Sequence, residues 1–210
     1  MNFIVYSHRH GQNILETNPE FTNTWLEIQK ALSNITDEML LQVHRQKYID
    51  SNKSLSKAIN QLIKEQLATF GWKSESYIFK DKRYKNKAWR LDFAKDIISV
   101  EVAFNHSGTI AWNLMKPVIA SELNHVEKAV QTKIGIIISA TNELRDSGGF
   151  DSAIGTYEKY IEHLMPLNTQ LTVPLVIVGL KKPETFLLKH IKSVKIKQED
   201  ELNIMLMRNY

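Results

Sequence analysis

The stretch "RLDFAKDIISVEVAF", Arg90–Phe104, decides how this chain is interpreted, because it sets two acidic residues in apolar, strand-like sequence. The residues Ala94–Asp96 form a short polar break, so the stretch predicts a hairpin of two antiparallel strands. In such a hairpin Asp92 falls opposite or diagonal to Glu101. Strand alternation also puts Ala103 on the same face as Glu101. The hairpin therefore predicts two converging carboxylates beside a small apolar residue.

Two carboxylates within reach of each other, with a backbone carbonyl between them, suit a hard cation such as Mg²⁺. Such a cation polarises a phosphate and acidifies a bound water. The alternative is that Asp92 and Glu101 are solvated residues on the polar face of a half-buried hairpin. Their spacing alone does not decide between these interpretations.

A basic segment, "KDKRYKNKAWR", directly precedes the hairpin and interleaves cations with Tyr84 and Trp89. Basic residues alternating with aromatic ones are typical of a surface that grips nucleic-acid phosphates. A solvated basic loop is the alternative, because most charge runs are that. Its position beside the carboxylates favours a role in phosphate binding.

The composition limits the classes of protein to which the chain can belong. It has 210 residues, no cysteine and a formal net charge of +4. Without cysteine there is no disulfide framework, zinc–thiolate site or thiol nucleophile, which favours a reducing compartment. The apolar run at the start is too short for a signal peptide, and no apolar window of membrane-spanning length follows. We expect one domain over residues 1–210, in the cytoplasm and without contact to a membrane.

Hydrophobic periodicity predicts an α/β fold, with a mixed central β-sheet flanked by helices. One helix should begin near Asn18 with Pro19 at its first position and bury Phe21, Trp25, Ile28 and Leu32. The other expected helices are 54–70, 109–130 with a kink near Pro117, and 152–164, and the other expected strands are 77–79, 133–140 and 174–180.

Several segments resemble one branch of a known family. "LDF" followed after a short turn by "SVEVAFN" is similar to the active-site hairpin of PD-(D/E)XK nucleases, specifically type II restriction endonucleases of the BamHI, BglII and BstYI branch. "VYSH", "TWLEIQ", "INQLIKEQLATFGWK" and "PLVIVGL" also resemble segments of that branch, with the nearest likeness to BstYI. Together these segments extend over most of the chain.

The resemblance implies a role for each matching residue of the hairpin. It makes Asp92 and Glu101 the metal-binding carboxylates, with the main-chain carbonyl of Val102 as a third oxygen ligand. Asn60 falls where the branch has a helix residue that touches the metal or its waters. An amide on the helix surface without function is the alternative for Asn60.

The resemblance also implies a set of DNA contacts. Asn105 and His106 follow the catalytic strand where the branch approaches DNA, although His106 could equally be a capping or surface histidine. Ser152 falls in a segment that corresponds to a base-reading turn. The residues expected to contact DNA are Asn105, His106, Ser107, Arg83, Lys85, Lys116 and Ser152.

Two positions depart from the family pattern. Leu91 replaces a proline that this branch often lacks, with no chemical consequence. Ala103 stands where the pattern has Lys, Gln or Glu, with Gln expected in this branch, and a methyl group contacts neither the attacking water nor the metal. We expect a catalytically impaired form, most simply an engineered inactivation. A naturally impaired copy, or a polar group supplied from elsewhere by Asn60 or Lys95, are the alternatives.

The resemblance implies a homodimeric, Mg²⁺-dependent endonuclease that cuts double-stranded DNA at a palindromic site, with a GATC core expected. Mn²⁺ should replace Mg²⁺, and Ca²⁺ should support binding without cleavage. The alternatives are a repair or junction-resolving nuclease with the same fold, and a DNA-binding protein that does not cleave. A DNA methyltransferase encoded next to the protein would favour restriction over both.

Overall fold

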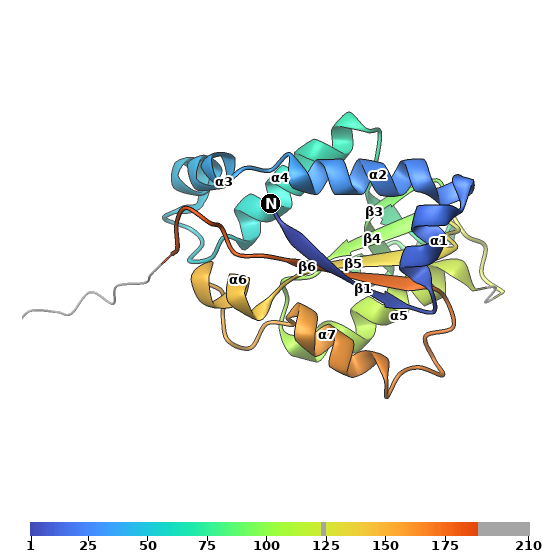
Figure 1. The fold of residues 1–210 in the computed structure, drawn as a ribbon. Helices are drawn as coiled ribbons and strands as arrows, with labels where there is room; N and C mark the ends of the chain where they lie inside the picture. The colour runs from blue at the N-terminus through green and yellow to red at the C-terminus, as the bar shows by residue number, and fades with distance from the viewer. Residues whose placement is uncertain (123–124, 189–210) are drawn as a thin grey trace, which may run out of the picture.

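A mixed six-stranded β-sheet forms the centre of the protein (Figure 1), in a computed structural model that describes residues 1–122 and 125–188. The strand order across the sheet is β1-β6-β5-β4-β3-β2. The strands are β1 (Phe3–His8), β2 (Lys73–Tyr77), β3 (Arg90–Lys95), β4 (Ile98–Val102), β5 (Ile134–Ala140) and β6 (Leu175–Leu180). This arrangement confirms the predicted fold class. The predicted single domain extends to residue 210, and residues 189–210 lie outside the described part.

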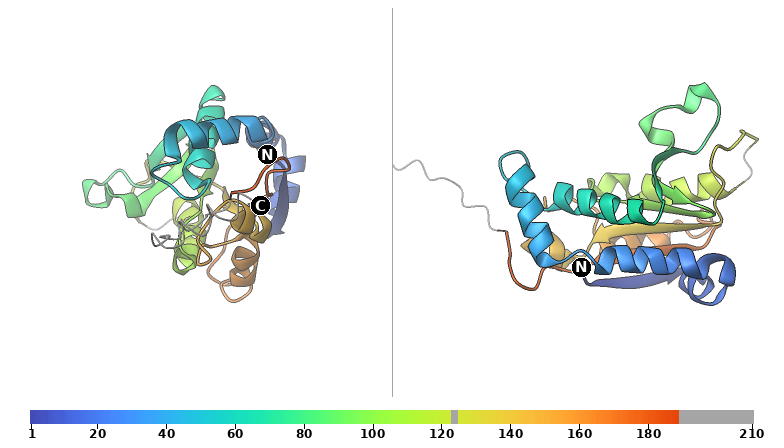
Figure 2. Two further views of the ribbon diagram at one scale, coloured as in Figure 1. Left: turned by 90° about the vertical axis from the view of Figure 1, so that its left-hand side faces the viewer. Right: turned by 90° about the horizontal axis from the view of Figure 1, so that it is seen from above.

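Helices cover both faces of the sheet, with α2 and α4 on one side and α5 and α7 on the other (Figures 1 and 2). The α-helices are α1 (Gly11–Thr17), α2 (Pro19–Ser33), α3 (Asp37–Val43), α4 (Ser56–Thr69), α5 (Ile110–Ser121), α6 (Asn142–Ser147) and α7 (Tyr157–Leu164). Short turns of other helix types are η1 (His44–Tyr48), η2 (Lys82–Tyr84), η3 (Lys87–Trp89) and η4 (Ser107–Thr109). Within the described residues, no helix is both long and apolar enough to cross a membrane.

The sheet combines antiparallel and parallel pairing. Strands β2, β3 and β4 pair antiparallel in sequence order, whereas β4, β5 and β6 run parallel to one another. Every residue of β5 and β6 is buried, which explains their continuous apolar sequences. The helix α5 connects β4 to β5, so the segment after the acidic hairpin returns across one face of the sheet.

The helix α2 forms as its sequence predicts. The Asn18 side chain accepts a hydrogen bond from the Glu20 amide and caps the helix, and Pro19 occupies the first turn. Its predicted apolar face is buried in the main core cluster, which contains Phe21, Trp25, Ile28 and Leu32. The helix α4 likewise lies within the range predicted for it.

The helix α5 is shorter than its apolar periodicity predicts. It keeps Pro117 in its interior but ends at Ser121, and Glu122 is extended. Val126 and Val130, which would continue the helical face, instead pack against the cluster beneath the β2–β3 connection. Residues 123 and 124 of the predicted helix lie outside the described residues.

Two other predicted elements start at the wrong residue. The strand before the hairpin is the polar segment Lys73–Tyr77, not 77–79, because Phe79 is drawn into an aromatic cluster and bridges to Lys128. The last helix begins at Tyr157, not at 152, because residues 153–155 pair with the backbone that follows β4. In both places long-range pairing outweighs the local pattern.

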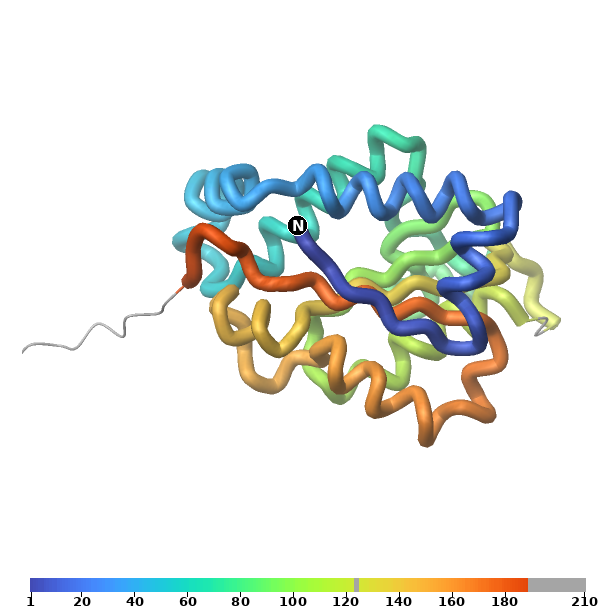
Figure 3. The backbone as a smooth tube through the Cα atoms, viewed as in Figure 1, coloured from blue at the N-terminus to red at the C-terminus, as the bar shows by residue number. Residues whose placement is uncertain are grey.

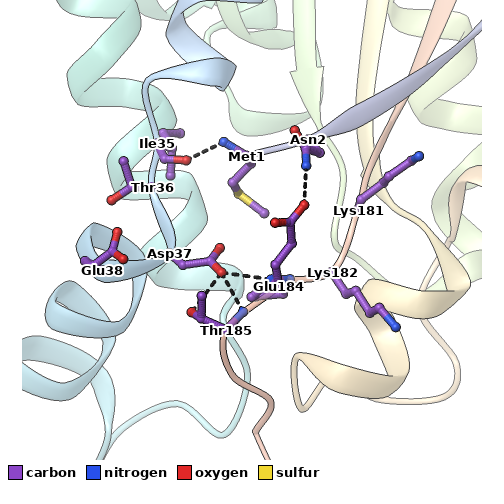
Figure 4. Close-up of a pocket in the computed structure, with 11 residues that line it drawn as sticks. Met1, Asn2, Ile35, Thr36, Asp37, Glu38, Lys181, Lys182, Glu184 and Thr185 are labelled. Carbon is purple, nitrogen blue, oxygen red and sulfur yellow. Dashed lines mark hydrogen bonds between the residues drawn. The ribbon is translucent and has the colours of Figure 1, made fainter.

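The first strand, β1, had no clear sequence signal but completes the sheet. It pairs antiparallel with β6, and Figure 3 shows these two segments of the chain side by side. Figure 4 shows how this region is tied to the connection between α2 and α3. Asn2 donates to the Glu184 carboxylate at 2.8 Å, and Asp37 accepts from the Glu184 amide and from Thr185.

Close contact between α5 and β5 fixes the height of the helix above the sheet. A Cβ atom added at Gly135 would lie 2.3 Å from Cβ of Pro117, well inside van der Waals contact. Only glycine therefore lets the proline of α5 rest on this strand. The contact holds α5 at a defined position relative to the neighbouring strand β4.

We expect Gly135→Ala to destabilise the protein by about 3 kcal/mol, because the added methyl group overpacks the contact with Pro117. Gly71→Ala is the matched control, since Gly71 has a positive φ of 78° but a Cβ added there would meet no described atom within 4 Å. The control should cost only about 1 kcal/mol of backbone strain. Urea unfolding followed by circular dichroism measures both values, and equal losses would contradict a steric role for Gly135.

Candidate active site

The two acidic residues of the hairpin lie where the backbone pairing of β3 and β4 ends. The strands pair from Lys95↔Ile98 to Phe93↔Val100, and one residue further on Asp92 and Glu101 lie opposite each other. The Asp92 amide donates to Oε1 of Glu101 at 3.2 Å. The Val102 amide donates to Oδ2 of Asp92 at 2.8 Å. The convergence predicted for these carboxylates is thereby confirmed, and each accepts a backbone amide from the other's strand.

Burial makes this pair electrostatically costly. Glu101 is only 2% exposed, and burial, followed by the nearby Asp92 carboxylate, raises its pKa to about 8, against the opposing effect of Lys116. Burial also raises the pKa of Asp92, partly offset by the Val102 amide and by Lys116. Two carboxylates held this close favour a bound cation.

The positive charge beside Glu101 comes from α5. Nζ of Lys116 lies 2.6 Å from Oε2 of Glu101, and Lys116 is 9% exposed. The sequence predicted a DNA contact for Lys116, but the structure places its ammonium group inside the carboxylate site. One turn earlier, Asn113 donates to the hydroxyl of Tyr160 on α7 at 2.7 Å. Polar groups of α5 and α7 thus line the same face as Glu101.

Ala103 has the orientation that strand alternation predicts. It is 2% exposed and belongs to the apolar cluster that includes Ile110 and Leu114 of α5. Val100 belongs to the opposite cluster, under α2 and α4. Residue 103 therefore shares the α5 side of β4 with Glu101, and its methyl group offers no polar atom there.

Asn60 approaches the carboxylates from the other layer. It is exposed on α4 and lines a pocket of about 290 Å³ together with Asp92, Val102 and Asn105. The pocket joins α4 to the open end of the hairpin, so Asn60 lies on the same pocket wall as Asp92.

Glu75 is an acidic residue of this site that no sequence pattern singled out. The register of β2 and β3 places it opposite Asp92, so Glu75, Asp92 and Glu101 occupy one row across three strands. Its backbone has a positive φ of 57°, and its carboxylate lies 3.4 Å from Arg90. A non-glycine residue in this conformation inside a strand indicates a distortion of the edge. Because the sequence of β2 is polar, no strand was predicted there, and Glu75 could not be assigned to the site.

Several predicted DNA-contact residues form one surface. The Ser107 amide donates to the Ala153 carbonyl at 2.7 Å, and the Gly155 amide to the Asn105 carbonyl at 2.9 Å. This pairing brings the segment after β4 next to the exposed Ser152. His106 is exposed and its Nδ1 accepts from the Gly108 amide at 3.0 Å, so it caps η4.

The basic connection between β2 and β3 projects from the edge of the sheet (Figure 2). Arg83 is exposed and paired with Asp81, and Lys85 lies over the Tyr77 ring. Among the described residues, neither Arg83 nor Lys85 contacts the carboxylate pair. Their predicted role on DNA would therefore be at a distance from the carboxylates.

The oxygen atoms of this site fit a hard divalent cation. Each carboxylate uses an oxygen to hold a backbone amide, which fixes its orientation, and Asp92 also faces the pocket. In residues 1–122 and 125–188 no three Asp, Glu, His or Cys side chains gather closely enough to hold a metal ion. Asp92 and Glu101, one oxygen of which already contacts Lys116, could hold Mg²⁺ only together with other oxygens, such as those of the Val102 main chain and of Asn60.

Comparison with known proteins identifies the family. The profile of the family described as restriction endonuclease BglII/BglIII matches residues 3–180, which is most of the chain. The chain belongs to this family. It is accordingly a type II restriction endonuclease, as the resemblance of its hairpin implies. The search of curated proteins finds no match.

Solved structures agree with this fold. The chain is similar to the crystal structure of restriction endonuclease BglII complexed with a DNA 16-mer, with a TM-score of 0.63 and 23% identity over 88% of this chain and 79% of that chain. It is also similar to free BglII, with a TM-score of 0.51 and 20% identity over 88% of this chain and 82% of that chain. At these identities the likeness establishes the fold.

We expect Asp92→Asn to abolish stabilisation by divalent cations and to leave the fold intact. The asparagine oxygen can still accept the Val102 amide, whereas the charge that attracts the cation is lost. Asp96→Asn is the control, because Asp96 lies at the hairpin turn with a positive φ of 49°, which Asn tolerates.

Thermal melting with Ca²⁺ and with a chelator measures this difference. The parent and the Asp96 variant should melt at a higher temperature in Ca²⁺, and the Asp92 variant at the same temperature in both solutions. Unfolding of the Asp92 variant in the chelator, with an unchanged response to Ca²⁺, would show that Asp92 serves the fold instead.

Proposed function

We propose that this restriction endonuclease hydrolyses double-stranded DNA at a palindromic site with a GATC core, using Mg²⁺ held by the two hairpin carboxylates. The observation that carries the proposal is the facing pair of the buried Glu101 and the half-buried Asp92 at the open end of the β3–β4 ladder. Mn²⁺ would replace Mg²⁺, and Ca²⁺ would support binding without cleavage. As a nuclease that restricts incoming DNA, the protein would act in the cytoplasm of a prokaryotic cell.

The hairpin residues would bind the cation that activates the phosphate and the water. Bound at Asp92 and Glu101, Mg²⁺ would polarise the scissile phosphate and acidify the attacking water. Asp92 is the carboxylate that faces the pocket, so it would hold the cation on the DNA side, and the buried Glu101 would hold it from the protein side. Asn60, on the wall of the same pocket, would contact waters of the cation.

DNA would be held by the surface around the open end of the hairpin. Asn105, Ser107 and Ser152 lie on two paired segments beside the pocket. His106 and Ser152 would approach base edges, and the exposed Arg83 and Lys85 would bind phosphates farther along the duplex. The similarity of the fold to BglII, which was solved in complex with a DNA 16-mer, supports DNA as the partner.

A homodimer would match the symmetry of the site. A palindrome presents the same contacts twice, so two copies related by a two-fold axis would each cut one strand. A single copy would have one carboxylate pair and so would nick only one strand in each encounter.

The proposal predicts specific, salt-sensitive DNA binding. In Ca²⁺ the protein should select duplexes with one palindromic sequence from a randomised library, and bind that sequence at least about 10³-fold more tightly than a scrambled duplex. Affinity should fall steeply as the salt concentration rises, because bound phosphates release counterions.

Sequencing of the selected duplexes and fluorescence anisotropy at several salt concentrations measure these properties. Equal affinity for selected and scrambled duplexes at every salt concentration would contradict a site-specific enzyme. Binding to the selected duplex without any cleavage in Mg²⁺, both by the protein and by its Ala103→Gln variant, would instead favour the DNA-binding protein that does not cleave.

A further inference from the structure

The alanine at position 103 leaves the proposed cleavage reaction without one polar group. Directly after β4, this position shares the α5 side with Glu101, so a longer polar side chain there would lie beside the carboxylates of the proposed site. The methyl group of Ala103 is enclosed by the cluster that contains Ile110 and Leu114. If no other residue served the site from this side, cleavage would be slow or absent.

Lys116 enters the site from the same side. Its ammonium group lies 2.6 Å from Oε2 of Glu101, the residue two positions before Ala103 on the same face of β4. Pro117, the residue after Lys116 on α5, packs against Gly135 of β5. The backbone of Lys116 therefore has a defined position above the sheet. The ammonium group has three donors, and only one is needed for the contact with Glu101.

The two residues proposed from the sequence as substitutes do not fit this role. Nζ of Lys95 lies 2.7 Å from both carboxylate oxygens of Glu27 and 2.8 Å from the Phe70 carbonyl. These partners belong to the α2–α4 layer, on the far side of the sheet from Glu101. Asn60 also comes from the α4 layer, where it lines the pocket with Asp92 and Val102, whereas Ala103 packs in the cluster under α5.

The charge of Lys116 also fits the site. Asp92 and Glu101 would carry two negative charges when they hold a divalent cation, and the scissile phosphate would add a third. A fixed ammonium group beside Glu101 supplies positive charge next to that phosphate, in a buried place where its effect is large. The carboxylate that it already contacts offsets part of its cost of burial.

We propose that Lys116 is the catalytic polar group of this enzyme, supplied by α5 in place of the side chain missing at position 103. This inference rests on the proposed function of the Asp92–Glu101 site. In the reaction, the oxygen of a water forms a bond to phosphorus and the bond to the leaving sugar oxygen breaks. The water loses a proton to solvent and the leaving oxygen gains one. Lys116 donates hydrogen bonds to the attacking water and the phosphate, and it forms and breaks no covalent bond to phosphorus.

The test compares cleavage with binding in the full-length protein. Single-turnover cleavage in Mg²⁺ is measured on the duplex that the parent selects in Ca²⁺, for the parent, Lys116→Ala, Lys116→Gln and Ala103→Gln. Lys95→Ala is the matched control, because it removes another partly buried lysine–glutamate pair from the same hairpin. Melting temperature and affinity in Ca²⁺ are recorded for every variant, and cleavage is repeated with added ethylammonium.

We expect the parent and Lys95→Ala to cleave at similar rates, and both Lys116 variants to cleave at least about 10²-fold more slowly. Affinity in Ca²⁺ should fall far less than the rate does, because Lys116 would be one of many contacts to the duplex. Added ethylammonium should raise the rate of Lys116→Ala but not that of Lys116→Gln, since only the alanine variant leaves room for the amine. If Lys116→Ala unfolds, the cleavage rate of Lys116→Gln relative to the parent tests the inference in its place.

Two results would overturn the inference. Cleavage by a folded Lys116 variant within about threefold of the parent would show that the lysine is not catalytic. A parent that binds the selected duplex but does not cut it, while Ala103→Gln does, would show that position 103 has no substitute. Both results leave the proposed endonuclease function standing, whereas failure of the parent to select any duplex would contradict that function itself.

Discussion

The structure of the site depends on how two carboxylates satisfy the backbone where two strands part. After the pair Phe93↔Val100 the β3–β4 ladder no longer closes, and the amides of Asp92 and Val102 donate to the carboxylates of Glu101 and Asp92 instead. These bonds compensate for the lost ladder and hold both acids in a fixed orientation. The same arrangement concentrates negative charge in a buried place, which a cation can stabilise.

The elements around the end of the β3–β4 pairing complete the site. The α5 helix returns over the sheet and rests on Gly135, which brings Lys116 to Glu101. From the opposite layer, α4 and the edge strand β2 complete the walls of the pocket at Asp92. The site is thus built where two layers meet at the end of a hairpin, and substitutions in either layer should affect it differently: α5 through the reaction and α4 through access to the pocket.

Much of this fold could be predicted from local sequence patterns. The hairpin, its two facing acids and the orientation of residue 103 follow from strand alternation, and the buried strands β5 and β6 follow from continuous apolar runs. Local patterns failed where distant segments compete: Val126 and Val130 have helical spacing but cover the β2–β3 connection, and β2 is too polar to suggest a strand. Lys116 and Glu75 could not be placed in the site, because their positions depend on helix packing and strand register.

The central claim is that the opening between β3 and β4 binds a divalent cation. Anomalous X-ray scattering from crystals of the protein with its selected duplex and Mn²⁺ tests this claim most directly. The account predicts an anomalous peak at about 2.2 Å from carboxylate oxygens of both Asp92 and Glu101, with a neighbouring phosphate oxygen as a further ligand. A fully occupied Mn²⁺ site elsewhere on the protein, with DNA bound and no peak between these two carboxylates, would contradict it.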